Sequence, residues 1–211
     1  MQQNQFTDEK IWNYCIETST GISTDLENLA NETIENLHGA HMLSEKMVVK
    51  ILQFFAFTLD AKICVDVGTY SGMSAVAMAE IVSKDAIIYT IDRKPQIGAE
   101  LAKKYCSKYP NIKIIVEDAL DALPKLPNNI DLVFIDADKK NIKQYFDILV
   151  DKMSHKGLII VDDVLWRGNV VNPEDNLAKI FDGFNRYIES RDDLDNIVLP
   201  LRHGINVIRK K

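Results

Sequence analysis

Short hydrophobic runs alternate with longer amphipathic stretches from Lys62 to the end of the chain. This alternation is typical of an α/β protein in which helices cover both faces of a largely parallel sheet. The hydrophobic runs predict seven strands, at 62–67, 86–91, 112–116, 131–135, 157–161, 196–201 and 205–209. Because only a short turn separates the last two, we expect them to pair antiparallel as a C-terminal hairpin.

The amphipathic stretches predict helices between the strands, at 74–83, 95–108, 140–152 and 174–191. The last of these is expected to begin after Asn172-Pro173, with asparagine as the cap and proline in the first turn. Three more helices are predicted ahead of the sheet, at 8–18, 24–37 and 44–59. Since these helices have no strands of their own to cover, we expect them to form a lid over the site or a subunit contact.

The predicted fold class is therefore a doubly wound, Rossmann-like α/β fold. Its sheet has seven strands and is mostly parallel, with an antiparallel C-terminal hairpin and extra N-terminal helices. A chain of 211 residues is long enough for one such domain and short for two. We expect a single domain, 1–211, with the N-terminal helices in 1–60 and the sheet core in 61–211.

Composition narrows the class of protein further. The chain has 25 Lys and Arg against 31 Asp and Glu, and its net charge is −6. This charge argues against an extensive electrostatic interface with nucleic acid. Three widely spaced cysteines indicate reduced thiols rather than a disulfide framework. Neither a secretory leader nor a membrane-spanning run is visible, so a cytoplasmic protein without a membrane partner is expected.

Two of the predicted strands run directly into acidic residues. Asp136-Ala137-Asp138-Lys139 follows the strand at 131–135, and Asp162-Asp163 follows the strand at 157–161. The carboxyl ends of parallel strands share one edge of a sheet, where open α/β folds bind their ligands. Carboxylates brought together there suit a hard divalent cation, Mg²⁺ first and Ca²⁺ or Mn²⁺ as alternatives. The other interpretation is that they are simply polar residues that end strands.

A glycine-containing loop, Asp66 to Ser74, follows the first predicted strand. Gly68 and Gly72 allow a sharp turn and close approach to a ligand, and the helix that follows offers free amide groups. The second strand ends at Asp92, where a carboxylate can accept both hydroxyls of a ribose. The third ends before Asp118 and Ala119, where an adenine amino group can be read. A structural turn and solvated strand-end acids are the alternatives.

These motifs, in this order, resemble the class I S-adenosylmethionine-dependent methyltransferases. DADKKN at 136–141 and VDDVLWRG at 161–168 narrow the resemblance to the cation-dependent O-methyltransferase family, which includes the caffeoyl-CoA and catechol O-methyltransferases. The resemblance extends from the LHGAHM segment at 37–42 to the LPLRHGINVIRK tail. It implies S-adenosylmethionine as cofactor, a small phenolic or catechol-like acceptor, and a homodimer.

The resemblance also implies roles for individual residues. Asp136, Asp162 and Asp163 match the metal ligands, and Lys139 matches the group that acts as base or orients the acceptor; beside a metal its pKa is expected to be lowered. Asn141 and Trp166 match positions that line the acceptor pocket, although such a tryptophan equally suits packing of the loop. The positions that match the cofactor site are Met42, Asp66, Gly68, Tyr70, Ser74, Asp92, Asp118, Ala119 and Asp136. Met42 equally suits a place in the core.

Three segments depart from the family pattern. Asp163 stands where relatives usually carry Asn, and the added charge is expected to tighten metal binding. Ser44 to Val49 lacks the usual glycine and glutamine. Arg202-His203-Gly204 replaces a more usual glycine and acid at a turn near the pocket. No firm role follows for Asp138, and His203 and His41 suit either a solvated loop or a substrate contact.

The favoured function is metal-dependent methyl transfer from S-adenosylmethionine to a hydroxyl of a small catechol-like acceptor. An alternative acceptor is 5-hydroxyuridine in tRNA, since Lys139, Lys140, Lys143, Arg167 and Arg202 could group at the mouth of the site. An alternative of another class is a non-catalytic S-adenosylmethionine-binding protein, which the retained oxygen donors and Lys139 disfavour. The glycine spacing, which is not GxGxxG, disfavours a nicotinamide oxidoreductase.

Overall fold

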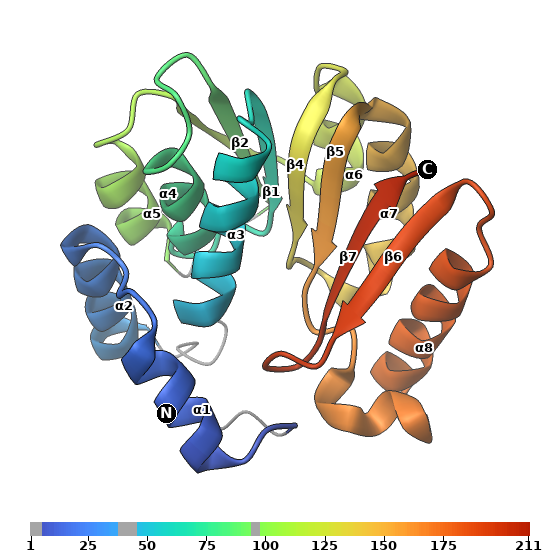
Figure 1. Ribbon diagram of the computed structural model, residues 1–211. Helices are drawn as coiled ribbons and strands as arrows, with labels where there is room; N and C mark the ends of the chain where they lie inside the picture. The colour runs from blue at the N-terminus through green and yellow to red at the C-terminus, as the bar shows by residue number, and fades with distance from the viewer. Residues whose placement is uncertain (1–5, 38–45, 94–97) are drawn as a thin grey trace.

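The structure, a computed structural model, describes residues 6–37, 46–93 and 98–211 (Figure 1). Its strands are β1 (Ile63–Val67), β2 (Ile87–Asp92), β3 (Ile112–Val116), β4 (Ile130–Ile135), β5 (Met153–Val161), β6 (Leu194–Leu199) and β7 (Ile205–Lys210). Its α-helices are α1 (Glu9–Thr18), α2 (Thr24–Asn36), α3 (Lys46–Thr58), α4 (Met73–Ala79), α5 (Ala99–Cys106), α6 (Ala119–Ala122), α7 (Ile142–Lys152) and α8 (Asn176–Glu189). Among the described residues, 3₁₀ segments join them at η2 (Leu123–Lys125), η3 (Lys139–Asn141) and η4 (Trp166–Val171).

The seven strands form one sheet in the order β3-β2-β1-β4-β5-β7-β6. The first five pair in parallel, and β7 pairs antiparallel with both β5 and β6, which confirms the predicted mixed sheet. The strand order reverses between β1 and β4. In open α/β sheets this switch point, beyond the carboxyl ends of the strands, is where ligands bind.

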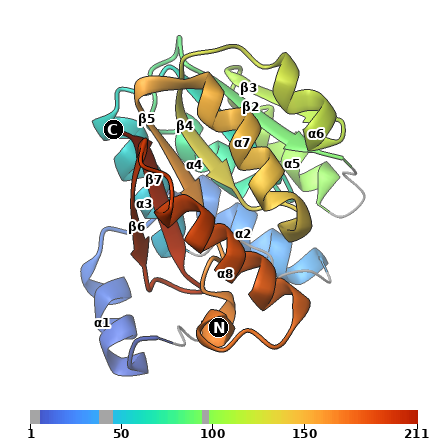
Figure 2. The same ribbon diagram turned by 90° about the vertical axis from the view of Figure 1, so that its right-hand side faces the viewer.

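Side chains alternate between two helical layers, because successive residues of a strand point to opposite faces. Cys64 of β1 and Phe134 of β4 belong to a core shared with α2, α3, α4 and α5. Val65 and Val133 belong to a second core shared with α6, α7 and α8. Figures 1 and 2 show these layers on the two sides of the sheet, so helices cover both faces as predicted.

The N-terminal helices differ in place from the prediction. Leu26 and Leu29 of α2 and Val48 and Leu52 of α3 are fully buried in the first core. α3 therefore does cover the sheet, because it packs on β4 beside α4, which covers β1 and β2. The premise that these helices have no strands to cover is wrong for α3, whereas α1 lies apart from the sheet, near the carboxyl ends of the parallel strands (Figure 1).

Two element starts also differ from the predicted ones. β5 begins at Met153, four residues before the apolar run, because Met153 pairs with Ile130 across an irregularity in the ladder. α8 begins after Asp175, whose carboxylate accepts the Leu177 and Ala178 amides at 2.9 and 2.8 Å, so the predicted Asn172-Pro173 cap is wrong.

Within the described ranges, no helix combines the length and apolar character that a membrane crossing needs.

We predict that truncation of α3 destabilises the whole domain. Leu52→Ala should lower the free energy of unfolding by about 2–5 kcal/mol, because Leu52 is fully buried. Val171→Ala, at a side chain 78% exposed, is the control and should stay within about 0.5 kcal/mol of wild type. Urea unfolding followed by circular dichroism measures both. Equal, small effects would mean that α3 is a detachable lid.

Candidate active site

The loop between β1 and α4 approaches the end of β4 more closely than a side chain allows. Gly68 has a φ of 117°, and a Cβ built there would lie 2.5 Å from the backbone oxygen of Asp136. Gly72, with a φ of 90°, also lies close to α5, where a Cβ would be 2.9 Å from Cys106 Sγ. Both glycines are thus required by close approach, and the first joins the two halves of the candidate site.

Asp66 is fully buried beneath this loop and is held by hydroxyl groups. Ser74 Oγ donates to one carboxylate oxygen at 2.8 Å, and Thr90 Oγ1 donates to the other at 2.6 Å. Burial raises the pKa of Asp66 to about 7, although both hydrogen bonds oppose the rise. The structure therefore places Asp66 and Ser74 as supports of the loop, and their direct contact with a cofactor stays a prediction.

The remaining predicted cofactor residues gather at the ends of β1, β2 and β3. The Tyr70 amide donates to Asp92 Oδ2 at 3.2 Å, so the glycine loop and the end of β2 are joined. Asp118 caps α6 by accepting the Leu120 amide at 2.9 Å, and the next residue, Ala119, is buried. This short helix was not predicted. Met42 and His41 lie outside the described residues.

Two polar atoms in the loop are buried without a hydrogen-bond partner, the Tyr70 hydroxyl and Ser71 Oγ. Buried polar groups in native proteins are normally satisfied, so unpaired ones at a strand end indicate a place for a polar ligand. Tyr70 was predicted to be a site residue. Ser71 was missed, because a serine between two glycine-flanked turns has no sequence signal that separates it from ordinary loop residues.

The predicted acidic cluster forms beyond β4 and β5, with Lys139 inside it. Lys139 Nζ lies 2.5 Å from Asp136 Oδ1 and 3.0 Å from Asp163 Oδ2. All three side chains are mostly buried, with 15–20% of each exposed. The other oxygen of Asp163, Oδ1, is buried and has no hydrogen-bond partner. An acceptor oxygen is therefore available next to a fixed positive charge.

Asp162 is paired with a different cation. Its carboxylate is fully buried and accepts Arg202 Nη1 at 3.0 Å, while its other oxygen accepts the Asp163 amide at 2.7 Å. Only 4% of the Arg202 side chain is exposed. Burial and the neighbouring carboxylates of Asp136 and Asp163 raise the pKa of Asp162 to about 7, and Arg202 opposes this rise.

The carboxylates do not fit a divalent cation as they stand. Oxygen donors suit such an ion chemically, but both oxygens of Asp162 and one oxygen each of Asp136 and Asp163 are engaged by donors of the protein. Within residues 6–37, 46–93 and 98–211, no three acidic, histidine or cysteine side chains are placed to hold a metal ion together. The predicted metal site therefore stays a prediction that this geometry does not support.

The two neighbouring carboxylates set the charge on Lys139, and the lowered pKa expected beside a metal stays a prediction. Burial alone would lower its pKa, but the carboxylates of Asp136 and Asp163 outweigh burial and the pKa lies above its ordinary value. Burial alone likewise raises the pKa of Asp163, and the charges of Lys139 and Arg202 reverse that and hold it below its usual range. Beside these carboxylates Lys139 is thus a protonated, positively charged group.

Asp138, Asn141 and Trp166 shape the loops around the cluster. Asp138 caps η3 by accepting the Lys140 amide at 3.2 Å and also accepts Asn141 Nδ2 at 3.3 Å, which gives Asp138 a structural role. The Trp166 ring stacks on Phe181 of α8 with ring centres 5.5 Å apart. Packing of the loop, the alternative interpretation of Trp166, is thus what the described side chains show.

Arg202 and His203 belong to the site, although the sequence indicated them only as departures from the family pattern. The turn that carries them is joined to the loop after β5, since the Leu165 amide donates to the His203 carbonyl at 2.8 Å. His203 Nδ1 is buried without a partner, and burial lowers the pKa of the ring. His203 is therefore a neutral, half-buried group beside the charged cluster.

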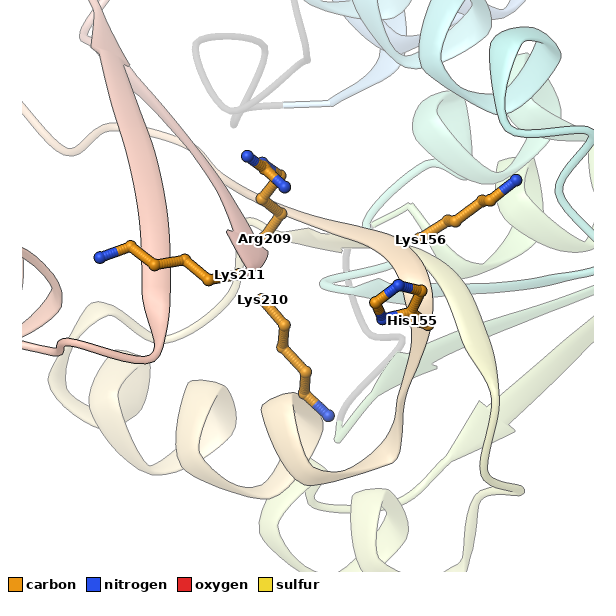
Figure 3. A pocket seen from close by; sticks show the side chains of 5 residues that line it. All are labelled: His155, Lys156, Arg209, Lys210 and Lys211. Atoms are coloured by element: carbon orange, nitrogen blue, oxygen red, sulfur yellow. The ribbon is translucent and has the colours of Figure 1, made fainter.

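A basic cluster lies at the opposite end of the sheet. His155 and Lys156 at the start of β5 and Arg209, Lys210 and Lys211 at the end of β7 surround a shallow hollow (Figure 3). Since β7 runs antiparallel to β5, the end of β7 lies at the amino ends of the parallel strands. The basic cluster is thus separate from the candidate active site.

Comparison with known proteins supports the same fold. The SAH-bound methyltransferase of Podospora anserina superposes with a TM-score of 0.87 at 25% identity, covering 96% of this chain and 94% of that chain. The O-methyltransferase TomG of Streptomyces achromogenes, at 21% identity, shows the same fold with a TM-score of 0.83 over 100% and 99% of the chains. The caffeoyl-CoA O-methyltransferase of Stellaria longipes is 27% identical over 96% of this chain and 90% of its own length.

The sheet order and the loops at its carboxyl edge define a methyltransferase of Rossmann-like fold. A family model described as O-methyltransferase matches residues 16–211. The chain therefore belongs to the O-methyltransferase family, in the group that resembles the caffeoyl-CoA enzymes.

The buried Asp66 predicts a specific pH dependence of stability. Its pKa is about 7 in the folded protein and near 3.8 when unfolded, so the folded state keeps a proton that the unfolded chain releases. Between these values stability should fall as pH rises, by roughly 1 kcal/mol per pH unit from this group. Asp66→Asn should flatten that slope in urea unfolding at several pH values. Parallel curves for wild type and variant would contradict the assignment.

Proposed function

We propose that the chain is an S-adenosylmethionine-dependent O-methyltransferase that acts on a hydroxyl of a small phenolic, catechol-like acceptor. One observation carries the proposal: Asp163 Oδ1, a buried oxygen without a partner, lies beside the ammonium of Lys139 at the strand-end edge. A hydroxyl group placed there has both an acceptor for its hydrogen and a positive charge for its oxygen. The membership in the O-methyltransferase family and the names of relatives such as the Stellaria longipes enzyme support the same chemistry.

The cofactor is assigned to the ends of β1, β2 and β3. Gly68 keeps the loop open to close approach, the unpaired Tyr70 hydroxyl and Ser71 Oγ offer hydrogen bonds, and Asp92 and Asp118 stand where a ribose and an adenine would be read. Relatives solved with SAM or SAH support this assignment. When bound, S-adenosylmethionine supplies an electrophilic methyl group on a positively charged sulfur.

The chain then has two tasks at the acceptor. Lys139 stabilises the negative charge that develops on the acceptor oxygen, because its ammonium is fixed by two carboxylates before any ligand arrives. Asp163 Oδ1 accepts a hydrogen bond from the hydroxyl, which orients the oxygen, and would take the proton as the oxygen–methyl bond forms and the sulfur–methyl bond breaks. Asn141 and Trp166 are kept as pocket residues in this proposal, Trp166 through its loop. A divalent cation is left out of the reaction, because the carboxylates that would bind it are engaged by Lys139 and Arg202.

We predict that Lys139→Met lowers kcat by about 100-fold or more, because it removes a preorganised charge at the reacting oxygen. Binding of S-adenosylhomocysteine, measured by isothermal titration calorimetry, should be retained. Lys140→Met, at the exposed neighbouring residue, is the matched control and should behave as wild type. Transfer of a labelled methyl group to a panel of catechols and phenols measures turnover. If the two variants were equally active, the role of Lys139 would be wrong.

The same assay separates the alternative functions. Bulk tRNA in the acceptor panel tests the 5-hydroxyuridine alternative, which the site geometry does not favour, since Lys139 and Arg202 are paired inside the cluster and Lys143 lies 2.6 Å from Asp147. Binding of S-adenosylhomocysteine without turnover on any acceptor would favour a non-catalytic cofactor-binding protein. Turnover on a small phenol decides for the proposed function.

We also propose that the protein is a homodimer that acts in the cytoplasm. All three cysteines are free thiols, which suits a reducing compartment. The N-terminal helices expose several large apolar side chains, more than a free surface needs: Ile11, Tyr14, Ile34, Phe54 and Phe57, which are 57–71% exposed. A second copy of the chain would cover them.

The dimer can be tested with Phe54 and Phe57 of α3. Changing both to serine should convert the dimer to a monomer in light scattering coupled to gel filtration, because two exposed aromatic rings are lost from the contact. Val171→Ser, equally exposed but on η4, is the control and should remain dimeric. A wild-type protein that is already monomeric would contradict the proposal.

A further inference from the structure

Arg202 combines a strained backbone conformation with a buried, paired side chain. Its backbone has a φ of 54°, the left-handed region that favours glycine, in a turn that already ends with a glycine of φ 94°. A non-glycine residue in that region costs on the order of 1 kcal/mol and persists where the surrounding structure needs the side chain. The side chain is 96% buried and donates to Asp162 at 3.0 Å. The strained position is therefore occupied by an arginine for its guanidinium.

The charges of the cluster are almost balanced by the protein itself. Three carboxyl groups, those of Asp136, Asp162 and Asp163, face two cationic groups, those of Lys139 and Arg202, within one buried group of contacts. A divalent cation that bound the engaged carboxylate oxygens would displace Lys139 from two carboxylates or Arg202 from a fully buried one. Either displacement would leave a buried positive charge without its partner, which costs several kcal/mol.

We propose that Arg202, together with Lys139, supplies the positive charge of the acceptor site, so that this chain transfers methyl groups without a divalent cation. This inference rests on the proposed function for its catalytic part only. Arg202 is a positioning residue here: it holds one oxygen of Asp162, and the other oxygen of Asp162 accepts the Asp163 amide and so sets the position of Asp163. Lys139 is the group that faces the acceptor oxygen.

The same geometry explains how the departures from the family pattern fit together. Asp163, in place of the more usual asparagine, adds a negative charge, and Arg202, at the altered turn, adds a positive one. Both charges meet through Asp162 and Lys139. The expectation that Asp163 alone tightens metal binding therefore omits the cation that accompanies it.

The test uses Mn²⁺, whose free form is measured by electron paramagnetic resonance, on protein freed of metal with a chelator. Wild type should show no saturable Mn²⁺ binding in the sub-millimolar range. Arg202→Met, which keeps the backbone strain and the apolar stem, and Arg202→Gly, which relieves the strain, should each bind Mn²⁺ at least roughly tenfold more tightly, because a positive charge at the carboxylates is lost. Mn²⁺ should then raise the Tm of these variants and not that of wild type.

Arg209→Met is the matched control. Arg209 also pairs with an aspartate, Asp195, at 2.8 Å, but on the exposed end of the hairpin, so its loss should change neither Mn²⁺ binding nor turnover. Two Arg202 variants are used so that the result does not depend on the folding of either one.

Methyl transfer with and without the chelator completes the test. Wild-type turnover that persists in the chelator supports the inference, whereas turnover that is lost and then restored by Mg²⁺ overturns it. Saturable Mn²⁺ binding by wild type, or no gain of binding in either Arg202 variant, also overturns it. If no acceptor is turned over under any condition, the proposed function fails, but the Mn²⁺ measurements still decide whether Arg202 and Lys139 exclude the cation.

Discussion

The buried ion pair between Asp162 and Arg202 joins the carboxyl end of β5 to the turn between β6 and β7. Two backbone hydrogen bonds extend this junction, from the Val164 amide to the Gly204 carbonyl at 3.0 Å and from the Leu165 amide to the His203 carbonyl at 2.8 Å. The loop after β5 therefore has one position relative to the hairpin. Because Asp163 follows Asp162 directly and donates its amide to it, the place of the Asp163 carboxylate depends on the same pair.

The two ends of the site handle a buried carboxylate in different ways. Asp66, beneath the cofactor loop, has only hydroxyl donors, so burial dominates and its pKa is raised to about 7. Asp162, beneath the acceptor loop, has a guanidinium within hydrogen-bond distance. Burial raises the pKa of both carboxyl groups to about 7, and what differs is the group that opposes the rise, the hydroxyls of Thr90 and Ser74 at Asp66 and the guanidinium of Arg202 at Asp162. Which donor each carboxyl group receives depends on which strand ends and turns the topology brings together.

Much of the fold follows from sequence because its signal is local. Continuous apolar runs predicted all seven strands, and the short turn before Ile205 predicted the antiparallel hairpin. The start of β5 at Met153 was not predictable, since Ser154, His155 and Lys156 carry no strand pattern and are held by pairing with β4. The burial of α3 likewise could not be predicted, because the face of the sheet on which α3 packs is known only once the strands are assembled.

The candidate site could be predicted as a set of residues but not as a set of contacts. Acids after strands 4 and 5 had to meet, because parallel strands end at one edge. Their partners are a different matter: whether Lys139 reaches Asp136 and Asp163, or Arg202 reaches Asp162, depends on turn conformations such as the positive φ of Arg202. Sequence shows the charges and their order along the chain, and only the folded turns decide which of them neutralise each other.

The positive charge at the acceptor oxygen can come from a bound metal ion or from Lys139, and the two sources favour different acceptors. A divalent ion binds two vicinal oxygens at once and thereby selects a catechol. An ammonium and a carboxylate oxygen need only one hydroxyl group, the oxygen facing Lys139 and the hydrogen facing Asp163. Selection among acceptors would then come from the walls of the pocket, including the loop that Trp166 anchors on Phe181 and the segment at Phe6 that lies against Gly168. If Lys139 supplies the cation, the choice of acceptor therefore depends on the shape of the pocket and not on chelation of two hydroxyl groups.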